Sequence, residues 1–121
     1  MPVIAAVLVA AVALLHAWFL VLEMFLWRRP IGLRTFGMTA EQARTTAVLA
    51  ANQGLYNGFL AAGLAVGLIA AEPTAYYFRL FFLVCVIVAG LYGAATVSRR
   101  ILLVQALPAA LALAAVVIAG V

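Results

Sequence analysis

The sequence predicts an all-α membrane protein whose four transmembrane helices form an antiparallel bundle. Of its residues, 70% are hydrophobic and only 8% are charged, whereas about half of an ordinary soluble domain is apolar. The apolar residues occur in long runs, and about 20 consecutive apolar residues suffice for a helix to cross a bilayer. Short segments that contain charged residues, Pro or Gly separate the runs. These three observations favour a multi-pass membrane protein over a soluble domain.

Four apolar runs mark the expected spans and leave room for one domain. They lie near residues 3–27, 44–71, 76–97 and 101–121, and we expect residues 1–121 to form a single four-helix membrane domain. Because the connecting segments are short, successive helices are expected to run in opposite directions. Any functional site would then lie between helices.

The first run contains His16 and Glu23 and no other ionisable side chain. The two residues are seven positions apart, which is only about 20° around an α-helix, so they share one face. A carboxylate that contacts lipid costs about 2.5 to 3.5 kcal/mol, so we expect this face to point into the bundle or toward a partner subunit. The alternative is that Glu23 lies near enough to the interface to reach water or Arg28 and serves only as a polar tether.

The segment between the first two spans is expected to be irregular and to end at a helix start. Pro30, Gly32 and Gly37 disfavour a continuous helix there. Residues 39–42, Thr-Ala-Glu-Gln, then have the spacing of a capping box, in which two side chains satisfy the first backbone N–H groups of a helix. We therefore predict that the second helix begins at this point, in the headgroup layer.

The second run has two different faces. One face is an arc of about 140° that carries three amides and a tyrosine, and each of these groups needs a hydrogen-bond partner at membrane depth. The opposite face is made of small residues, which allow another helix to approach closely. The polar arc consists of Asn52, Gln53, Tyr56 and Asn57, and the small face consists of Ala47, Ala51, Gly54, Gly58, Ala61 and Ala65. The polar arc predicts either a binding site or hydrogen bonding between helices.

Polar groups also occur in the third and fourth runs. The third run contains Tyr92, and the fourth contains Gln105 followed by Pro108, which frees a backbone carbonyl because proline has no N–H. We therefore predict a polar pocket in the cytoplasmic half of the bundle, to which all four helices contribute. Its lining would be Glu23, Asn52, Gln53, Tyr56, Tyr92 and Gln105, with His16 and Asn57 above it.

A depth count aligns the polar groups of the first two helices. At 1.5 Å per residue from the cytoplasmic ends, Glu23 lies roughly 7 Å deep and Asn52 roughly 12 Å. His16 and Asn57 both lie roughly 18 to 20 Å deep by the same count. The count therefore predicts that His16 and Asn57 lie at a similar depth, above Glu23 and Asn52.

The charges predict the orientation in the membrane. The net charge is +4, and all basic residues are arginine. Six arginines fall on one side of the predicted spans, which the positive-inside rule assigns to the cytoplasm. They are Arg28, Arg29, Arg34, Arg44, Arg99 and Arg100. We expect an inner-membrane protein with both termini outside the cytoplasm, whose arginines contact membrane lipid phosphates.

Several function classes are excluded or disfavoured. A chain without lysine cannot be a Walker-type ATPase or a Schiff-base enzyme. His16 and Glu23 would lie about 10 Å apart on a helix and cannot chelate one ion by themselves, so we expect no metal and no cofactor. Ser98 has no base beside it for nucleophilic catalysis. Nucleic-acid binding is not expected, because the bilayer would occupy the surface that such a site needs.

The interpretation that fits these observations best is a homo-oligomer, assembled through small-residue faces, that binds a small lipophilic or amphipathic molecule in the polar pocket. Three alternatives stay open. One is a proton-coupled small-molecule exporter in which Glu23 exchanges a proton for a cationic hydrophobe. The others are a glutathione-type membrane enzyme and a structural membrane subunit. Whether the protein is an enzyme is open as well.

Two resemblances accompany this interpretation. Residues 22–27, Leu-Glu-Met-Phe-Leu-Trp, and residues 51–61, Ala-Asn-Gln-Gly-Leu-Tyr-Asn-Gly-Phe-Leu-Ala, resemble a bacterial family of four-helix integral membrane proteins classed as a domain of unknown function. This resemblance covers nearly the whole chain and implies no established activity. Residues 51–53 and 59–61 are also similar to parts of a motif in the membrane-associated eicosanoid and glutathione metabolism superfamily. The acidic residue usual in that motif is absent here, where Leu55 and Tyr56 stand.

Overall fold

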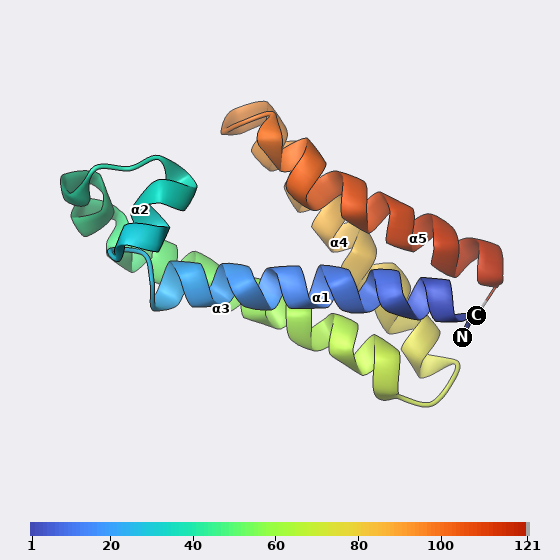
Figure 1. The fold of residues 1–121 in the computed structure, drawn as a ribbon. Coiled ribbons are helices and arrows are strands. Elements are labelled where there is room, and N and C mark those ends of the chain that lie inside the picture. Colours follow the sequence, from blue (N-terminus) through green and yellow to red (C-terminus); the bar gives the residue numbers. More distant parts are fainter. Residues whose placement is uncertain (121) are drawn as a thin grey trace. The chain divides into compact units, whose positions relative to one another are not determined.

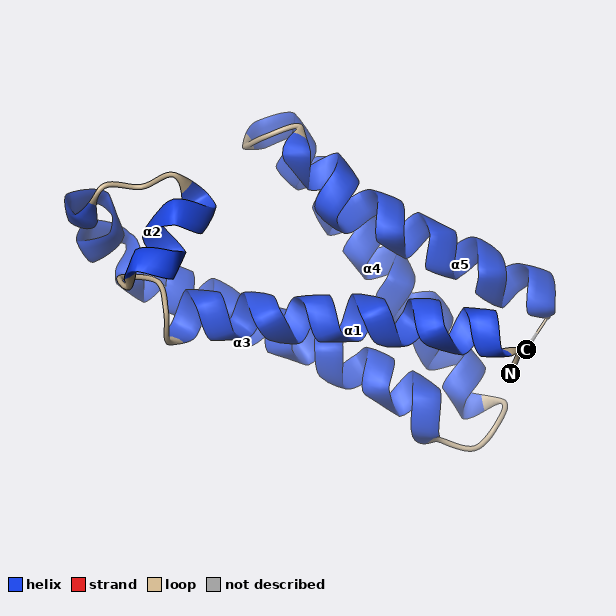
Figure 2. Ribbon diagram, viewed as in Figure 1, coloured by secondary structure: helices blue, strands red, loops and turns tan. Residues whose placement is uncertain are grey.

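The computed structural model describes residues 1–120, and every regular element among them is helical (Figures 1 and 2). The prediction of an all-α fold is therefore confirmed. Val121, the last residue of the predicted fourth span, lies outside the described residues. In chain order the elements are α1 (Val3–Met24), α2 (Pro30–Phe36), α3 (Ala40–Ile69), α4 (Thr74–Thr96), the π-helix η1 (Leu102–Ala106) and α5 (Leu107–Ala119).

Length and composition indicate a membrane protein. Within residues 1–120, three helical stretches are long and apolar enough to cross a bilayer, namely Val3–Met24, Thr74–Thr96 and Leu102–Ala119. The remaining long helix, α3, has 30 residues, but its four amides, together with Glu41 and Arg44, make it less apolar than the other stretches. The predicted second span coincides with α3, and its place in a four-span bundle stays a prediction.

The chain forms two compact units. We call residues 15–59 the arginine-rich unit, and residues 1–14 together with the chain from residue 60 onward the apolar unit. The helices α1 and α3 each contribute one part to each unit. The expectation of a single domain stays a prediction, and the units are described separately below.

The core of the apolar unit is made of small and branched aliphatic side chains. In this unit α4 packs along η1 and α5. Gly90 of α4 allows a close approach of the two backbones, because a Cβ atom at this position would lie only 2.8 Å from the Ala106 backbone nitrogen. The buried core residues are Ala5, Val9, Val12, Leu64, Leu83, Val86, Ala109, Ala112 and Val116.

The fourth predicted span begins with a π-helix. Pro108 lies in the first turn of α5, directly after the wide turn η1. A proline cannot donate to the carbonyl four residues before it, and helices commonly adjust to such a gap by widening one turn. The backbone carbonyl that Pro108 was expected to leave free therefore lies where the helix changes from π to α.

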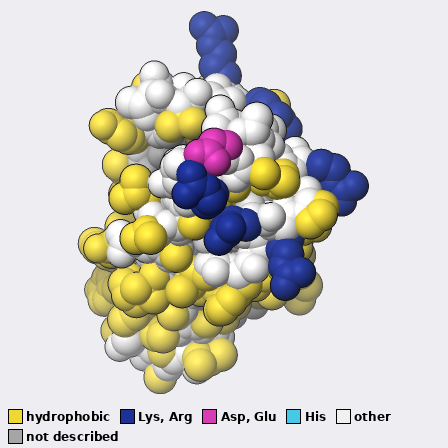
Figure 3. Space-filling model, turned by 90° about the vertical axis from the view of Figure 1, so that its left-hand side faces the viewer, with side chains coloured by type: hydrophobic (Ala, Val, Ile, Leu, Met, Phe, Trp, Pro, Cys, Tyr) yellow, Lys and Arg dark blue, Asp and Glu magenta, His cyan; other side chains and the backbone are white. Residues whose placement is uncertain are grey.

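The arginine-rich unit contains an element that the sequence analysis missed. We expected residues 30–37 to be irregular, but Pro30–Phe36 form α2, so that prediction was wrong. Pro30 occupies the start of the helix, where its missing N–H costs nothing, and Gly37 ends it with a left-handed φ of 62°. Proline and glycine are thus the boundaries of a short helix here. Figure 3 shows arginine side chains gathered on the face that this part of the molecule presents.

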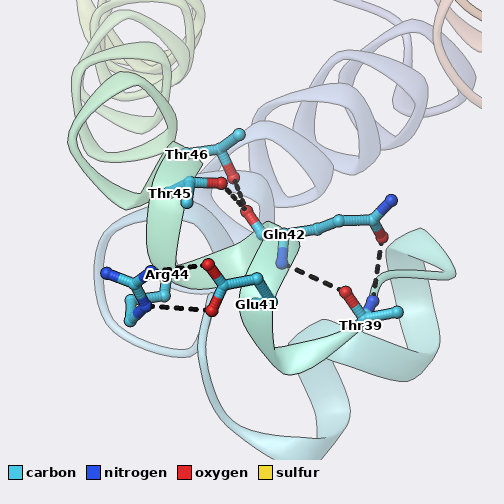
Figure 4. A network of polar contacts seen from close by, with 6 residues as sticks. All are labelled: Thr39, Glu41, Gln42, Arg44, Thr45 and Thr46. Carbon is cyan, nitrogen blue, oxygen red and sulfur yellow. Dashed lines mark hydrogen bonds and ion pairs between the residues drawn. The ribbon is translucent and has the colours of Figure 1, made fainter.

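The predicted capping box at the start of α3 is confirmed (Figure 4). The Thr39 backbone N–H donates to Gln42 Oε1 at 2.9 Å, and the Gln42 N–H donates to Thr39 Oγ1 at 3.1 Å. Glu41 and Arg44 form an exposed ion pair at 2.6 Å in the same turn. The helix therefore begins at Ala40, four residues before the predicted span.

Trp27 joins the three helical parts of the arginine-rich unit. Its indole Nε1 donates to Thr46 Oγ1 of α3 at 3.1 Å. Its ring packs against Phe36 of α2, with the ring centroids 4.8 Å apart. Gly32 of α2 is buried against the backbone carbonyls of Leu26 and Trp27, where a side chain would not fit. The chain that leaves α1 is thus held in place on both sides.

Candidate functional site

Glu23 and Asn57 form the central contact of the candidate site. The amide Nδ2 of Asn57 donates to Glu23 Oε1 at 2.5 Å, from α3 to the last turn of α1. Asn57 is only 6% exposed. A hydrogen bond to a charged group contributes about 1.5 to 3 kcal/mol, so this pair orients the carboxylate. The two residues belong to the same unit.

Two glycines of α3 bring the helices close enough for this bond. A Cβ atom on Gly54 would lie 2.7 Å from Met24 Cγ and 3.0 Å from Glu23 Cβ. A Cβ atom on Gly58 would lie 2.6 Å from Leu20 Cδ1. The small face of α3 is therefore used within the chain to pack α1, as the Gly-x-x-x-Gly spacing permits.

The register of the two helices differs from the depth count. Asn57 was expected level with His16, but it bonds to Glu23. The count assumed that both helices start at one level. Gly54 instead lies against Met24, the last residue of α1, so residues 40–53 of α3 extend beyond α1 by roughly 21 Å. That part of α3 lies beside Trp27, as the bond to Thr46 shows.

A hollow of about 440 Å³ lies beside Glu23, at the end of α1. This volume falls within the range of about 300 to 1,000 Å³ that is usual for small-molecule sites. Its lining combines one acidic and two basic residues with apolar and aromatic residues. The lining residues are Glu23, Met24, Phe25, Trp27, Arg28, Arg29 and Ala47, and all belong to the arginine-rich unit.

Glu23 and the two arginines of this hollow form no ion pair with each other in the described part of the chain. Among residues 1–120, the ion pairs are Arg44 with Glu41 and Arg79 with Glu72, so Glu23 forms none. Arg28 and Arg29 are exposed. Because the carboxylate and the guanidinium groups line one space without pairing, a molecule with complementary charges can contact both.

Three of the predicted pocket residues are exposed on α3. They are Asn52, Gln53 and Tyr56, of which Tyr56 is 54% accessible. Within residues 1–120, no hydrogen bond joins their side chains to Glu23. Tyr56 makes a ring contact with Phe59 at 5.7 Å. Their participation in a site with Glu23 stays a prediction.

The remaining predicted residues are spread over both units. His16 is fully buried in the arginine-rich unit and contacts the Phe19 ring edge-on at 5.2 Å. Tyr92, which is 72% exposed, and the half-buried Gln105 belong to the apolar unit. The structure thus brings together Glu23 and Asn57 of the predicted set.

Sequence reasoning missed the roles of Arg28 and Arg29 in the hollow. It treated them as marks of membrane orientation, although Arg28 was considered as a contact for Glu23. The available signal was their position, because both follow Glu23 within two turns and directly follow the aromatic Trp27. The turns that follow α1 place both arginines along the same hollow as Glu23.

A second charged group is buried in the apolar unit. Arg79 of α4 is 1% exposed, pairs with Glu72 at 2.9 Å and donates to the Gly67 carbonyl at 2.6 Å. Its guanidinium carbon also lies 5.7 Å from the centre of the Tyr76 ring. The hydrogen bond from Arg79 lowers the pKa of the Glu72 carboxyl, aided by the Tyr76 backbone N–H. These contacts clamp the turn between α3 and α4.

The described helices define a class of all-α proteins with several segments able to cross a membrane. The chain belongs to the family described as "Protein of unknown function (DUF1304)", whose profile matches residues 10–117. It is 32% identical over 115 residues to "Uncharacterized protein YpaA" from Lactococcus lactis subsp. lactis (strain IL1403), across 93% of this chain and 96% of that relative. The predicted membership of a family of unknown function is confirmed. No solved structure matches the chain.

Proposed function

We propose that this protein binds a small amphipathic molecule in the hollow beside Glu23, at the edge of the membrane. One observation carries the proposal: the carboxylate is fixed by Asn57 and faces a hollow of about 440 Å³ without an ion-pair partner among residues 1–120. A carboxylate near hydrocarbon is costly, and such residues commonly mark binding or transport sites. The apolar walls suit the hydrocarbon part of a ligand.

The proposal includes a membrane arrangement. In it, α1, α3, α4 and the η1–α5 stretch form four antiparallel spans in the inner membrane, with both termini outside the cytoplasm. The exposed arginines support this orientation, because positively charged loops tend to stay in the cytoplasm. The amphipathic environment of α2, between Trp27 and the exposed arginines, suits the headgroup layer.

The proposal also includes a homo-oligomer, through a different face from the one expected. Gly54 and Gly58 already pack against α1, so they are less available for contact with a second copy. The exposed Asn52, Gln53 and Tyr56 carry donors and acceptors that need partners at membrane depth. The same face of a second copy offers complementary groups.

Native mass spectrometry of the protein in lipid nanodiscs tests the binding proposal. We expect the wild type to retain a small molecule that Glu23→Gln loses. The control is Glu41→Gln, which removes an exposed carboxylate far from the hollow and should leave retention unchanged. The proposal fails if the wild type carries no small molecule, or if both variants retain it equally.

A second candidate is proton-coupled export, favoured by the chemistry of the Glu23 partner. Asn57 is neutral in both protonation states of the carboxyl, so it does not compete as a cation for Glu23. A carboxyl of this kind can exchange a proton for a cationic ligand. In proteoliposomes that contain a pH-sensitive dye, an exporter would move protons when a cationic hydrophobe is added, and Glu23→Gln would abolish the signal.

A further inference from the structure

The positions of Glu23, Arg28 and Arg29 in the hollow indicate which kind of amphipathic molecule fits it. Glu23 lies in the last turn of α1, within a stretch able to cross the membrane, whereas Arg28 and Arg29 follow the end of that helix. Glu23 is therefore nearer the hydrocarbon core than the two arginines. This order holds whichever side of the membrane the end of α1 faces.

A ligand that contacts both Glu23 and the two arginines must carry its positive charge nearer the hydrocarbon core and its negative charge farther out. We propose that the hollow takes a zwitterionic amphiphile whose ammonium group adjoins its hydrocarbon chain and whose anionic group lies at the outer end. The ammonium would contact the Glu23 carboxylate, and the anionic group would contact Arg28 and Arg29. This inference rests on the proposed binding function and names the class of ligand.

Each of the three charged groups in the hollow is available to a ligand. Asn57 occupies Glu23 Oε1, and no ion pair within residues 1–120 uses the carboxylate. The guanidinium groups of Arg28 and Arg29 likewise have no carboxylate partner in that part of the chain. Arginine binds phosphate, sulfonate or carboxylate oxygens through paired N–H groups. A ligand of one charge would leave half of the site unmatched.

The apolar residues that line the hollow suit the hydrocarbon chain of such a ligand. Met24 and Phe25, which directly follow Glu23, line the hollow, and Ala47 lines it from the part of α3 that lies beside Trp27. Phe25 is 68% exposed, so a chain that enters from the bilayer can contact its ring. Trp27 is held by Thr46, which keeps its aromatic surface at the rim. Aromatic rings next to a carboxylate are favourable surroundings for ammonium groups.

Ordinary phospholipids have the opposite order of charges. In phosphatidylcholine and phosphatidylethanolamine the phosphate adjoins the chains and the ammonium lies outermost. Such a lipid would bring its phosphate to the level of Glu23, where like charges repel. The site should therefore discriminate against the bulk zwitterionic lipids of a membrane, which a lipid-binding surface without this charge order would not do.

Two detergents with the same tail test the charge order directly. A dodecyl sulfobetaine carries its ammonium next to the chain and its sulfonate outermost, and dodecyl phosphocholine has the reverse order. We would titrate each into the protein in maltoside micelles and measure the bound fraction by native mass spectrometry. We expect the sulfobetaine to bind the wild type at least about ten-fold more tightly than the phosphocholine. Glycine betaine, which has no tail, serves as the soluble zwitterion and should not bind.

Variants of the lining residues test whether the preference for the sulfobetaine comes from the hollow beside Glu23. Glu23→Gln keeps an oxygen for Asn57 but loses the charge, so it should abolish the preference while circular dichroism shows an intact helical fold. Arg28→Gln combined with Arg29→Gln should weaken sulfobetaine binding, whereas Arg34→Gln, outside the hollow, should not.

Each other outcome overturns the charge-order inference. Equal binding of the two detergents that depends on Glu23 would leave the binding function standing and refute the charge order. A preference for phosphocholine, or a preference that survives Glu23→Gln, would refute it as well. Tight binding of glycine betaine would show a soluble ligand instead of an amphiphile. If neither detergent binds, both the inference and the proposed binding of amphiphiles fail.

Discussion

Glu23 in the arginine-rich unit and Arg79 in the apolar unit are both charged side chains that pack against a glycine of α3, yet their surroundings differ. Arg79 is 1% exposed and has a carboxylate and a backbone carbonyl as partners. Glu23 has one neutral amide partner and faces a hollow. A charged side chain in an apolar helix can therefore be either bonded within the fold, as Arg79 is, or accessible to another molecule, as Glu23 is. Only the second kind is a candidate for ligand binding.

The largest effect on stability is expected at Arg79. Arg79→Met keeps most of the side-chain volume but removes the ion pair with Glu72 and leaves the buried Gly67 carbonyl without its donor. We expect a loss of about 2 to 3 kcal/mol in the free energy of unfolding. Unfolding in mixed micelles, followed by circular dichroism, measures it. Arg34→Met, on the exposed side of α2, is the control and should change little.

A slightly smaller loss is expected when a side chain is forced between α1 and α3. In Gly54→Val the new Cβ would lie 2.7 Å from Met24 Cγ, so the helices must separate. We expect a loss of about 1 to 3 kcal/mol in stability and, because the bond between Asn57 and Glu23 breaks, loss of sulfobetaine binding. Val48→Leu changes a residue of the same helix that is 84% exposed, and it should leave both properties unchanged. Unaltered binding in Gly54→Val would contradict the role of this contact.

Glu23→Gln should affect stability much less than Arg79→Met. The glutamine oxygen can still accept from Asn57, so we expect a change of less than about 1 kcal/mol in the free energy of unfolding. The same unfolding measurement applies to both variants. If Glu23→Gln lowered the free energy of unfolding as much as Arg79→Met, Glu23 would be a structural residue like Arg79, and the proposed difference between the two would be wrong.

The smallest expected effect is on the stability of the protein at low pH. Because the hydrogen bond from Arg79 lowers the pKa of Glu72, the pair stabilises the fold at pH values above the ordinary carboxyl pKa, and this contribution is lost as the pH falls through the lowered value. We therefore expect the difference in stability between the wild type and Glu72→Gln to be constant near neutral pH and to disappear in acid. A difference that grows toward low pH would have the wrong sign for this pair.

The elements that were predicted correctly have local causes. The long apolar helices follow from composition, and the start of α3 follows from Thr39 and Gln42, whose side chains bond within one turn. The close approach at Gly54 and Gly58 follows from their spacing, although the partner helix could not be read from it. Such features depend on neighbours in the sequence.

The features that were missed depend on distant parts of the chain. The short helix α2 is stabilised by the contact between Phe36 and Trp27, which pattern analysis does not reveal. The pairing of Glu23 with Asn57 depends on how far α3 extends beyond α1, and no local signal sets that length. The burial of Arg79 was missed because charge alone suggests a membrane edge, whereas Glu72 and Gly67 compensate it.

The wide turn η1 has a consequence for insertions and deletions. A π-turn holds one more residue than the α-turn it replaces. Deleting one residue from Leu102–Ala106 would let this segment close as an ordinary α-helix, and Ala109 and Val116 would keep their direction toward the core. Deleting one residue within α5 would rotate the rest of that helix by about 100° and carry those side chains out of the core. The last helical stretch therefore has one segment that tolerates a change in chain length.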